Sequence, residues 1–306
     1  MDALKMREDG TYLDATFGRG GHARRILDRL GPGGLLIALD ADPEAIAFGE
    51  RAFSSEHRLR LVRCNFRDLG AVARELAPEA GVDGILMDLG LSSPQLDSPK
   101  RGFSFRHDGP LDMRLDPESG VSAADWLAGI DEGRLVDVLR RLGEERFARR
   151  IAGAIVAARD IEPIRTTAQL AELIEKAMPA GAARASRIHP ATRSFQAIRI
   201  AVNGELEALD DALQAAIDAL APGGRLVVIS FHSLEDRRVK HAIREASTPP
   251  PASRRIPSSP EFRPRLRAVG KLLRPSEAEE STNPRARSAR MRVAERLGAS
   301  IQAGLA

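Results

Sequence analysis

The chain has little of what a secreted or membrane-spanning protein needs. Cys64 is the single cysteine among 306 residues, so the chain cannot form an internal disulfide and lacks the clustered cysteines of a zinc ribbon. No run approaches the roughly 18 apolar residues of a membrane span, and no signal sequence opens the chain. The histidines lack metal-ligand spacing, so we expect no metal site. With 43% hydrophobic residues, the sequence predicts a soluble, globular, cytoplasmic protein.

Positive charge is concentrated near the C-terminal end. The formal net charge of the chain is +3, yet residues 252–292 hold 11 Lys and Arg against 4 Asp and Glu. Such a segment either binds the phosphate backbone of a nucleic acid or forms a solvated surface. Charge alone leaves both interpretations open.

Strands and helices alternate along the first part of the chain. Strands are expected at residues 12–16, 35–39, 59–63 and 84–88, and helices at 22–30, 43–53 and 68–76. Asp42 and Pro43 are typical of a helix N-cap and of the first helical position. The alternation predicts an α/β fold with a doubly wound parallel sheet, whose ligand crevice lies at the carboxyl ends of the strands. Asp14, Asp40 and Asp88 stand at such ends.

A helical segment is inserted before the fifth strand, which we expect at residues 225–231. More than 100 residues separate it from Asp88, far more than a crossover needs. Helical spacing recurs at 123–127, 135–142, 147–158 and 167–177, and one long helix is expected at 194–220. We therefore expect a main domain of residues 1–108 and 190–306, and an inserted helical subdomain of residues 109–189 for substrate recognition. After the fifth strand, Ser233 and Asp236 match a capping box, and short strands are expected at 266–273 and 289–294.

A glycine-rich turn follows the first strand and predicts a cofactor site. Gly18, Gly20 and Gly21 allow a sharp turn and close approach of a ligand to the backbone. Gly18, Gly20 and Ala23 also match the loose dinucleotide pattern, with Asp40 in place to accept the ribose hydroxyls. However, Asp14 would repel a pyrophosphate and attract the ammonium and sulfonium groups of S-adenosylmethionine, which favours this methyl donor over NAD. Asp40 could instead cap the next helix, although Asp42 is better placed for that.

A second group of polar residues follows the fourth strand, from Asp88 to Asp97. Methyl transfer to an amine is an in-line displacement, which a protein assists by alignment, by desolvation and by accepting hydrogen bonds from the amine. Asp88, Ser92 and Ser93 are suited to that role and are the candidate catalytic residues. The alternative is that Ser92 to Pro94 form an ordinary turn.

Two further segments combine residues that could contact a substrate. Arg101, Phe103, Phe105 and Arg106 mix cations with aromatic rings, as platforms for single-stranded nucleic acid do, although a surface loop with two tucked rings explains them equally well. His232, Ser233 and Asp236 resemble a hydrolase triad only by adjacency, and the chain has no G-x-S-x-G elbow.

Eight motifs in one order resemble the bacterial RsmH/MraW family and cover nearly the whole chain. They are Asp14–His22, Gly84–Asp97, Arg101–Phe105, Gly109–Arg114, Gly143–Ala148, His189–Gln196, Ser230–Arg237 and Asn283–Ser288. The chain begins at Met1 without the His-x-Pro-Val-Leu segment usual before the first strand of this family.

The resemblance implies a class I, Rossmann-like S-adenosylmethionine-dependent methyltransferase. Its substrate would be N4 of a cytidine in the decoding region of small-subunit ribosomal RNA, in an assembled or nearly assembled subunit. The family's cofactor contacts fall on Gly20, Gly21, His22, Asp40, Phe66, Asp88 and Gln95, and its motif at Ser230–Arg237 adds His232 on the substrate side. From the residues alone, Phe66 is as consistent with a core position as with stacking on adenine. Alternatives are a methyltransferase acting on DNA or a small amine, and a noncatalytic ribosome-assembly factor that senses the donor.

Overall fold

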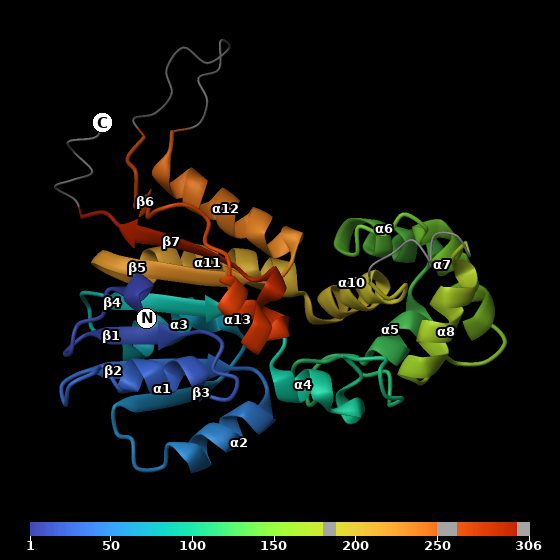
Figure 1. Cartoon of the computed structure of the whole chain (residues 1–306), viewed down its shortest axis with the longest axis horizontal. Coiled ribbons are helices and arrows are strands. Elements are labelled where there is room, and N and C mark those ends of the chain that lie inside the picture. The colour runs from blue at the N-terminus through green and yellow to red at the C-terminus, as the bar shows by residue number, and fades with distance from the viewer. Residues whose placement is uncertain (180–187, 250–261, 299–306) are drawn as a thin grey trace, which may run out of the picture. The chain divides into compact units, whose positions relative to one another are not determined.

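The chain divides into two compact units in a computed structural model that describes residues 1–179, 188–249 and 262–298 (Figure 1). Unit 1 comprises residues 1–90 and 206–306, and unit 2 comprises residues 91–205. Unit 2 therefore extends beyond the expected insertion at 109–189 on both sides. The reason is packing, since Leu91, Phe103 and Phe195 all join the hydrophobic core of unit 2.

Unit 1 is built on a seven-stranded sheet with the order β3-β2-β1-β4-β5-β7-β6. The strands are β1 (Thr11–Asp14), β2 (Leu35–Asp40), β3 (Leu59–Arg63), β4 (Val82–Asp88), β5 (Leu220–Ser230), β6 (Leu266–Ala268) and β7 (Arg290–Arg296). The first five strands are parallel, which confirms the predicted doubly wound α/β sheet, and β7 and β6 extend it in antiparallel fashion. Asp14, Asp40 and Asp88 end β1, β2 and β4, as predicted.

Helices cover both faces of this sheet (Figure 1). The helical elements of unit 1 are η1 (Asp2–Leu4), α1 (Gly21–Leu27), α2 (Pro43–Ala52), η2 (Phe66–Asp68), α3 (Leu69–Leu76), α11 (Glu205–Ala219), α12 (Ser233–Ser247), α13 (Glu277–Thr282) and η4 (Pro284–Ser288). Along β1 and β2, Leu13 and Ile37 pack with α3, α11 and α12, whereas Tyr12 and Leu36 pack with α1 on the other face. This alternation buries both faces and fixes the register of the strands.

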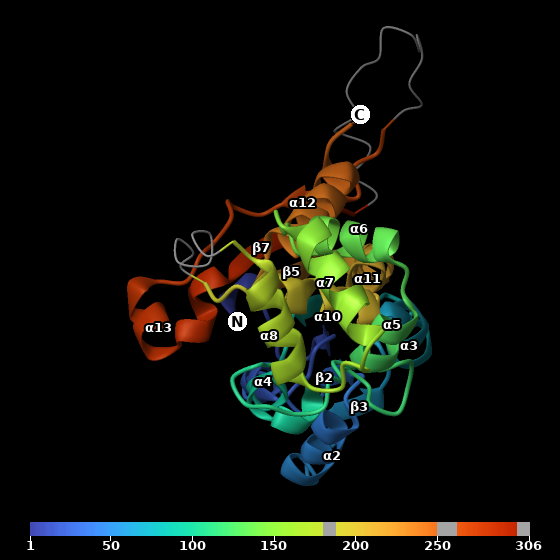
Figure 2. The same ribbon diagram turned by 90° about the vertical axis from the view of Figure 1, so that its right-hand side faces the viewer.

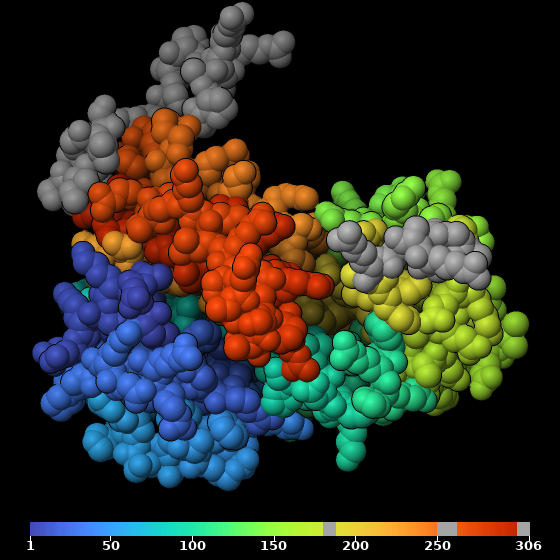
Figure 3. Space-filling view, in the orientation of Figure 1, coloured from blue at the N-terminus to red at the C-terminus, as the bar shows by residue number. Residues whose placement is uncertain are grey.

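The C-terminal part of unit 1 belongs to its sheet. β7 pairs with β5 from Arg225↔Glu295 to Ser230↔Arg290. Val293 and the half-buried Met291 share a hydrophobic cluster with the N-terminal Leu4, and Figure 3 shows red C-terminal residues beside blue N-terminal ones on one face of this unit. The predicted short strands at 266–273 and 289–294 are thus present, as a shorter β6 and a slightly longer β7.

Two expectations about local structure were wrong. The single helix expected at 194–220 is interrupted at Gly204, whose φ of 57° ends α10 (Thr192–Asn203) in the left-handed region before α11 begins. β5 starts at Leu220 instead of Arg225, because the ladder to β4 contains an irregularity between Leu220 and Arg225. Glycine and bulge geometry of this kind leave little trace in hydrophobic periodicity.

Unit 2 is helical, as the spacing predicted. Its elements are α4 (Ser93–Asp97), η3 (Pro99–Arg101), α5 (Ala123–Gly129), α6 (Glu132–Leu142), α7 (Ala148–Arg159), α8 (Thr167–Ala177) and α10. Consecutive helices pack on one another from α6 through α8, while α10 packs on α5 and α6 (Figure 2). Leu135, Ile151 and Leu170 are fully buried between them. In the described parts of both units, no helix is long and apolar enough to cross a membrane.

Candidate functional site

The turn from β1 into α1 has the glycine geometry that a ligand-binding loop requires. Gly18 and Gly20 have φ angles of 55° and 70°, which side-chain-bearing residues rarely adopt. A Cβ at Gly20 would also lie 2.7 Å from the ring of Phe53. Gly21 needs no positive φ, in contrast to our expectation of a sharp turn there. A Cβ at Gly21 would meet open space, so the room in front of this backbone is available to a ligand.

Asp40 ties the glycine turn to the next loop. Its two carboxylate oxygens accept hydrogen bonds from the backbone N–H of Gly18 at 2.7 Å and of Asp42 at 2.9 Å. Asp42 caps α2 by accepting a hydrogen bond from the N–H of Glu44, which confirms the prediction that Asp42, and not Asp40, is the N-cap residue. Asp40 thereby positions the turn, and its contact with ribose hydroxyls stays a prediction.

Three titratable side chains meet where β1, β4 and α1 converge. Asp14 is fully buried, and its Oδ1 accepts from the N–H of Thr16 at 3.1 Å. Asp88 Oδ2 lies 3.1 Å from His22 Nε2, and both side chains are about one-third exposed, at 31% and 32%. Among the described residues, Asp14 Oδ2 and Asp88 Oδ1 are buried oxygens without a hydrogen-bond partner. Buried carboxylate oxygens of this kind call for a proton or a cation.

The pKa values of two of these groups are raised. Burial raises the pKa of Asp14 to about 6, against the opposing attraction of His22. The hydrogen bond to Asp88 raises the pKa of His22 above its ordinary value, with burial acting in the opposite direction. Carboxylates and an imidazole in one group form an electronegative site, which suits a ligand with positive charges and disfavours a pyrophosphate. The residues present therefore fit the cationic methionyl end of S-adenosylmethionine.

Thr16 is a residue of this site that sequence reasoning missed. Its Oγ1 accepts a hydrogen bond from the backbone N–H of Asp88 at 2.7 Å, which joins the ends of β1 and β4. Its N–H also holds Asp14. The signal was a hydroxyl residue two positions after a strand-ending acid, but the partner strand is visible only in the fold.

Phe66 begins η2 after β3 and is half-buried against the core cluster of unit 1. It retains exposed surface, and its contact with adenine stays a prediction.

Ser92, Ser93 and Gln95 form the start of the short helix α4 in unit 2. The N–H of Ser92, the N-cap residue, donates to Gln95 Oε1 at 2.9 Å. Gln95 is buried, with 8% exposure. This arrangement is a capped helix start, where the alternative that we considered was an ordinary turn. The catalytic roles of Ser92 and Ser93 and the donor contact of Gln95 stay predictions.

Most of the expected nucleic-acid platform lies inside unit 2. Arg101 is 7% exposed, and its guanidinium donates to the carbonyl oxygens of Arg114 and Leu115 at 3.0 and 2.8 Å. Phe103 is also buried, while the ring of Phe105 packs on other side chains of this unit. The expected exposed platform is therefore wrong for Arg101 and Phe103, because an apolar core and two carbonyls hold them. Arg106 is exposed.

His232 and Asp236 have separate structural partners in unit 1. His232, not Ser233 as expected, is the N-cap residue of α12, and its ring accepts from the N–H of Glu235 at 3.4 Å. Asp236 pairs with Arg292 at 2.7 Å and with Arg290. The pairing of Asp236 agrees with the rejection of a hydrolase triad. His232 caps α12, and its contact with the substrate stays a prediction.

Several cations of the basic C-terminal segment are neutralised in a similar way. Arg267 pairs with Glu295 at 2.6 Å, and Arg265 pairs with Asp218 of α11. Arg290 and Arg292 form ion pairs with Asp236, and all of these pairs join elements within unit 1. Residues 250–261 of the same segment lie outside the described residues. None of the described residues form a cluster able to hold a metal ion.

The chain is similar to known proteins in sequence and, more distantly, in structure. Residues 1–297 match the model of the MraW methylase family. The chain is 56% identical to a ribosomal RNA small subunit methyltransferase H of Xanthomonas euvesicatoria over 99% of this chain and 88% of that protein. It is 57% identical to the protein of the same name from Xylella fastidiosa, over 97% of this chain and 94% of that one. An rRNA methylase structure from Streptococcus thermophilus has a TM-score of 0.42 at 11% identity, covering 97% of this chain and 93% of that one. The chain belongs to the MraW methylase family.

Proposed function

We propose that this enzyme transfers a methyl group from S-adenosylmethionine to N4 of a cytidine in the decoding region of small-subunit ribosomal RNA. The observation that carries the proposal is the identity of 56–57%, over nearly the whole chain, to relatives named ribosomal RNA small subunit methyltransferase H. The electronegative group at the ends of β1 and β4 supports the choice of a cationic donor over NAD.

On the donor side, each residue has a distinct task. Asp88 and His22 receive the positively charged methionyl end, while the backbone at Gly21 leaves room for it and Gly20 holds the turn against Phe53. Asp40 accepts the ribose hydroxyls from the end of β2, and Phe66 stacks on the adenine. When bound, S-adenosylmethionine supplies an electrophilic methyl group. Positioning residues assist such a displacement by aligning this group with the acceptor.

On the acceptor side, Asp88 is the candidate for holding the amine. The lone pair of a cytosine amino group is delocalised into the ring, so hydrogen-bond acceptors that favour charge developing on nitrogen assist the attack. Asp88 Oδ1 is such an acceptor with no other partner among the described residues, and Ser92 and Ser93 follow it closely in the chain. The base reaches Asp88 after extrusion from its stack, which costs least in a single-stranded or locally open RNA.

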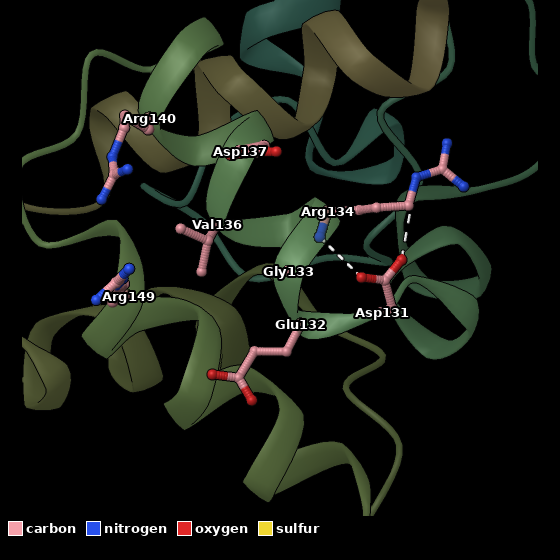
Figure 4. Close-up of a pocket in the computed structure, with 8 residues that line it drawn as sticks. All are labelled: Asp131, Glu132, Gly133, Arg134, Val136, Asp137, Arg140 and Arg149. Atoms are coloured by element: carbon pink, nitrogen blue, oxygen red, sulfur yellow. Dashed lines mark hydrogen bonds and ion pairs between the residues drawn. The ribbon is translucent and has the colours of Figure 1, made fainter.

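Unit 2 recognises the RNA through an arginine surface formed by Arg140 of α6 and Arg149 of α7. Both are exposed, and neither side chain has a hydrogen bond or ion pair with another described residue. Arg140 and Arg149 line one hollow and lie at the same side of it, away from Asp131 and Arg134 (Figure 4). Adjacent unpaired guanidiniums on two packed helices repel one another, and a phosphate backbone relieves that repulsion. Arg106 adds another exposed cation of this unit.

Labelled methyl transfer tests the proposed function. The acceptors are small ribosomal subunits from a strain lacking the enzyme, naked small-subunit RNA, DNA and small amines, each followed by nucleoside mass analysis. We expect N4-methylcytidine in small subunits that are assembled or nearly assembled. We expect the reaction to take place in the cytoplasm. Transfer to DNA or to a small amine would favour the other methyltransferase classes. Donor binding without transfer to any acceptor would indicate an assembly factor that senses the donor.

A further inference from the structure

Asp14 is a buried carboxylate beside His22 and Asp88, the residues to which we assign the charged end of the donor. It has 0% exposure, and the β1–β4 ladder pairs it with Leu86, two residues before Asp88. Its Oδ1 is held by the N–H of Thr16, whereas its Oδ2 has no partner among the described residues. A fully buried carboxylate with one unpartnered oxygen is unfavourable in its ionised form unless a positive charge lies nearby.

The charged groups around Asp14 come from three neighbouring elements. Asp88 on β4 and Asp40 on β2 are negative, while His22 on α1 is a group that can become positive and lowers the pKa of Asp14. Arg25, also on α1, acts on His22 and opposes its protonation. Without a ligand, three carboxylates therefore face one imidazole, and a bound proton offsets their repulsion. Burial correspondingly raises the pKa of Asp14 to about 6.

We propose that, in mildly acidic solution, binding of S-adenosylmethionine releases this proton, so that Asp14 is protonated in the free enzyme and ionised in the donor complex. The inference rests on the proposed donor. The positive charge of the ligand takes the place of the proton, which leaves the Asp14 carboxyl oxygen and passes to solvent. Asp14 thus acts through His22 and Asp88 as a positioning residue, and in mildly acidic solution its own negative charge appears only when the donor is bound.

The same reasoning separates donor from product. S-adenosylhomocysteine has lost the sulfonium charge and keeps the ammonium group, so it stabilises ionised Asp14 less. Proton return to Asp14 then accompanies departure of the product, and we expect the ratio of donor affinity to product affinity to increase from about pH 5 to about pH 7.

Calorimetric titration of the free enzyme in buffers with different ionisation enthalpies counts the protons. For wild type with S-adenosylmethionine, we expect about one proton released at about pH 5, about half at pH 6 and almost none at pH 8. The donor Kd should weaken by up to about tenfold per pH unit below pH 6. In Asp14→Asn, proton release should decrease and the donor Kd should become nearly independent of pH. The matched control is Asp42→Asn, a change at another buried acid of unit 1, in which proton release should persist.

Two results would overturn the inference. One is no proton release by the wild type between about pH 5 and pH 7, a measurement that needs no variant. The other is unchanged release in folded Asp14→Asn together with its loss in His22→Gln, which would assign the proton to His22. Both readouts use donor binding without RNA. A wrong RNA substrate therefore leaves them unaffected, while failure to bind S-adenosylmethionine at all would contradict the proposed function itself.

Discussion

His22 Nε2 lies 3.1 Å from Asp88 Oδ2 and joins the first turn of α1 to the end of β4. The contact leaves Asp88 Oδ1 buried and without a partner among the described residues. One carboxylate thus has one oxygen engaged with a side chain of the fold and another whose hydrogen-bonding capacity is unused. This division is the reason for assigning Asp88 both a positioning and a chemical role.

Asp88→Asn should slow methyl transfer by about a hundredfold or more, in line with the roughly 2.7–4 kcal/mol lost with one preorganised electrostatic group. The change keeps the size of the side chain and removes its charge. Single-turnover transfer at saturating donor and RNA is the measurement. The matched control is Asp83→Asn on the same strand, because Asp83 binds Arg7 and the N–H of Thr11. A near-normal rate in Asp88→Asn would move the chemistry to Ser92, Ser93 or the backbone.

Asp40→Ala should weaken binding of S-adenosylmethionine by about 1.5–3 kcal/mol, since it removes charged acceptors from the ribose hydroxyls. It also removes the acceptor of the Gly18 N–H, so the variant's fold should be checked by circular dichroism. Asp42→Ala is the control, because loss of the α2 cap should lower stability by about 1 kcal/mol and leave donor affinity unchanged. The same titration with NAD tests the dinucleotide alternative, which predicts tight binding.

Stability of the donor-free protein should decrease as pH rises through about 6. The pKa of Asp14 is about 6 in the fold against an ordinary value of 3.8, so the folded state binds a proton more tightly than the unfolded chain. The resulting stabilisation is complete below about pH 4 and is lost as pH rises past 6, a difference of about 3 kcal/mol. The raised pKa of His22 acts in the same direction at higher pH.

Urea unfolding followed by circular dichroism checks this pH dependence. Between pH 4 and pH 7, the free energy of unfolding of Asp14→Asn should increase relative to that of the wild type by up to about 3 kcal/mol. A stability difference that stays constant over this range would show that Asp14 carries no perturbed proton.

Replacing Arg140 and Arg149 together with Gln should weaken RNA binding and leave donor affinity unchanged. If each guanidinium contacts one phosphate, the slope of log affinity against log salt should flatten by about 1–2. Arg134→Gln is the matched control, because Arg134 lies on α6 at the other end of the same hollow, 4.0 Å from Asp131. If the slope of log RNA affinity against log salt is unchanged in the double variant, the arginine surface does not bind RNA and is only solvated.

Arg101 and Arg106 should respond differently to charge reversal. Arg106→Glu should weaken RNA binding with the fold intact, because the side chain is exposed. Arg101→Glu should destabilise unit 2 by about 1.5–3 kcal/mol or more, since it removes hydrogen bonds from a charged group to two carbonyls and buries an acid. Thermal unfolding monitored through Trp126, the chain's single tryptophan, reports on unit 2. Equal stability of the two variants would contradict the structural role of Arg101.

Periodicity and strand-end chemistry were sufficient to predict much of this fold. Strong local signals at Asp42 and Pro43 gave the start of α2, and helical spacing gave α5 to α8. Asp14, Asp40 and Asp88 were placed at strand ends because parallel strands bring their carboxyl ends to one edge. What could not be predicted depends on partners distant in the chain.

Three residues illustrate that limit. Arg101 looked like a surface cation, but carbonyl oxygens 13 and 14 residues away hold it inside unit 2. Asp236 looked like half of a capping box, but its partners Arg290 and Arg292 come from β7, more than 50 residues later. Thr16 reaches the backbone of Asp88 across a strand pair. Each of these contacts requires the sheet order or the helix packing, which composition and spacing do not contain.

The antiparallel pairing of β7 with β5 has a practical consequence for dissecting the enzyme. Deleting the C-terminal residues would expose β5 as a sheet edge and leave the buried Asp236 without its two arginines. A truncated protein that fails to bind RNA would therefore report on misfolding of unit 1 as much as on lost contacts. The contribution of this basic segment to RNA binding can be isolated by point changes at its exposed cations, with β7 left in place.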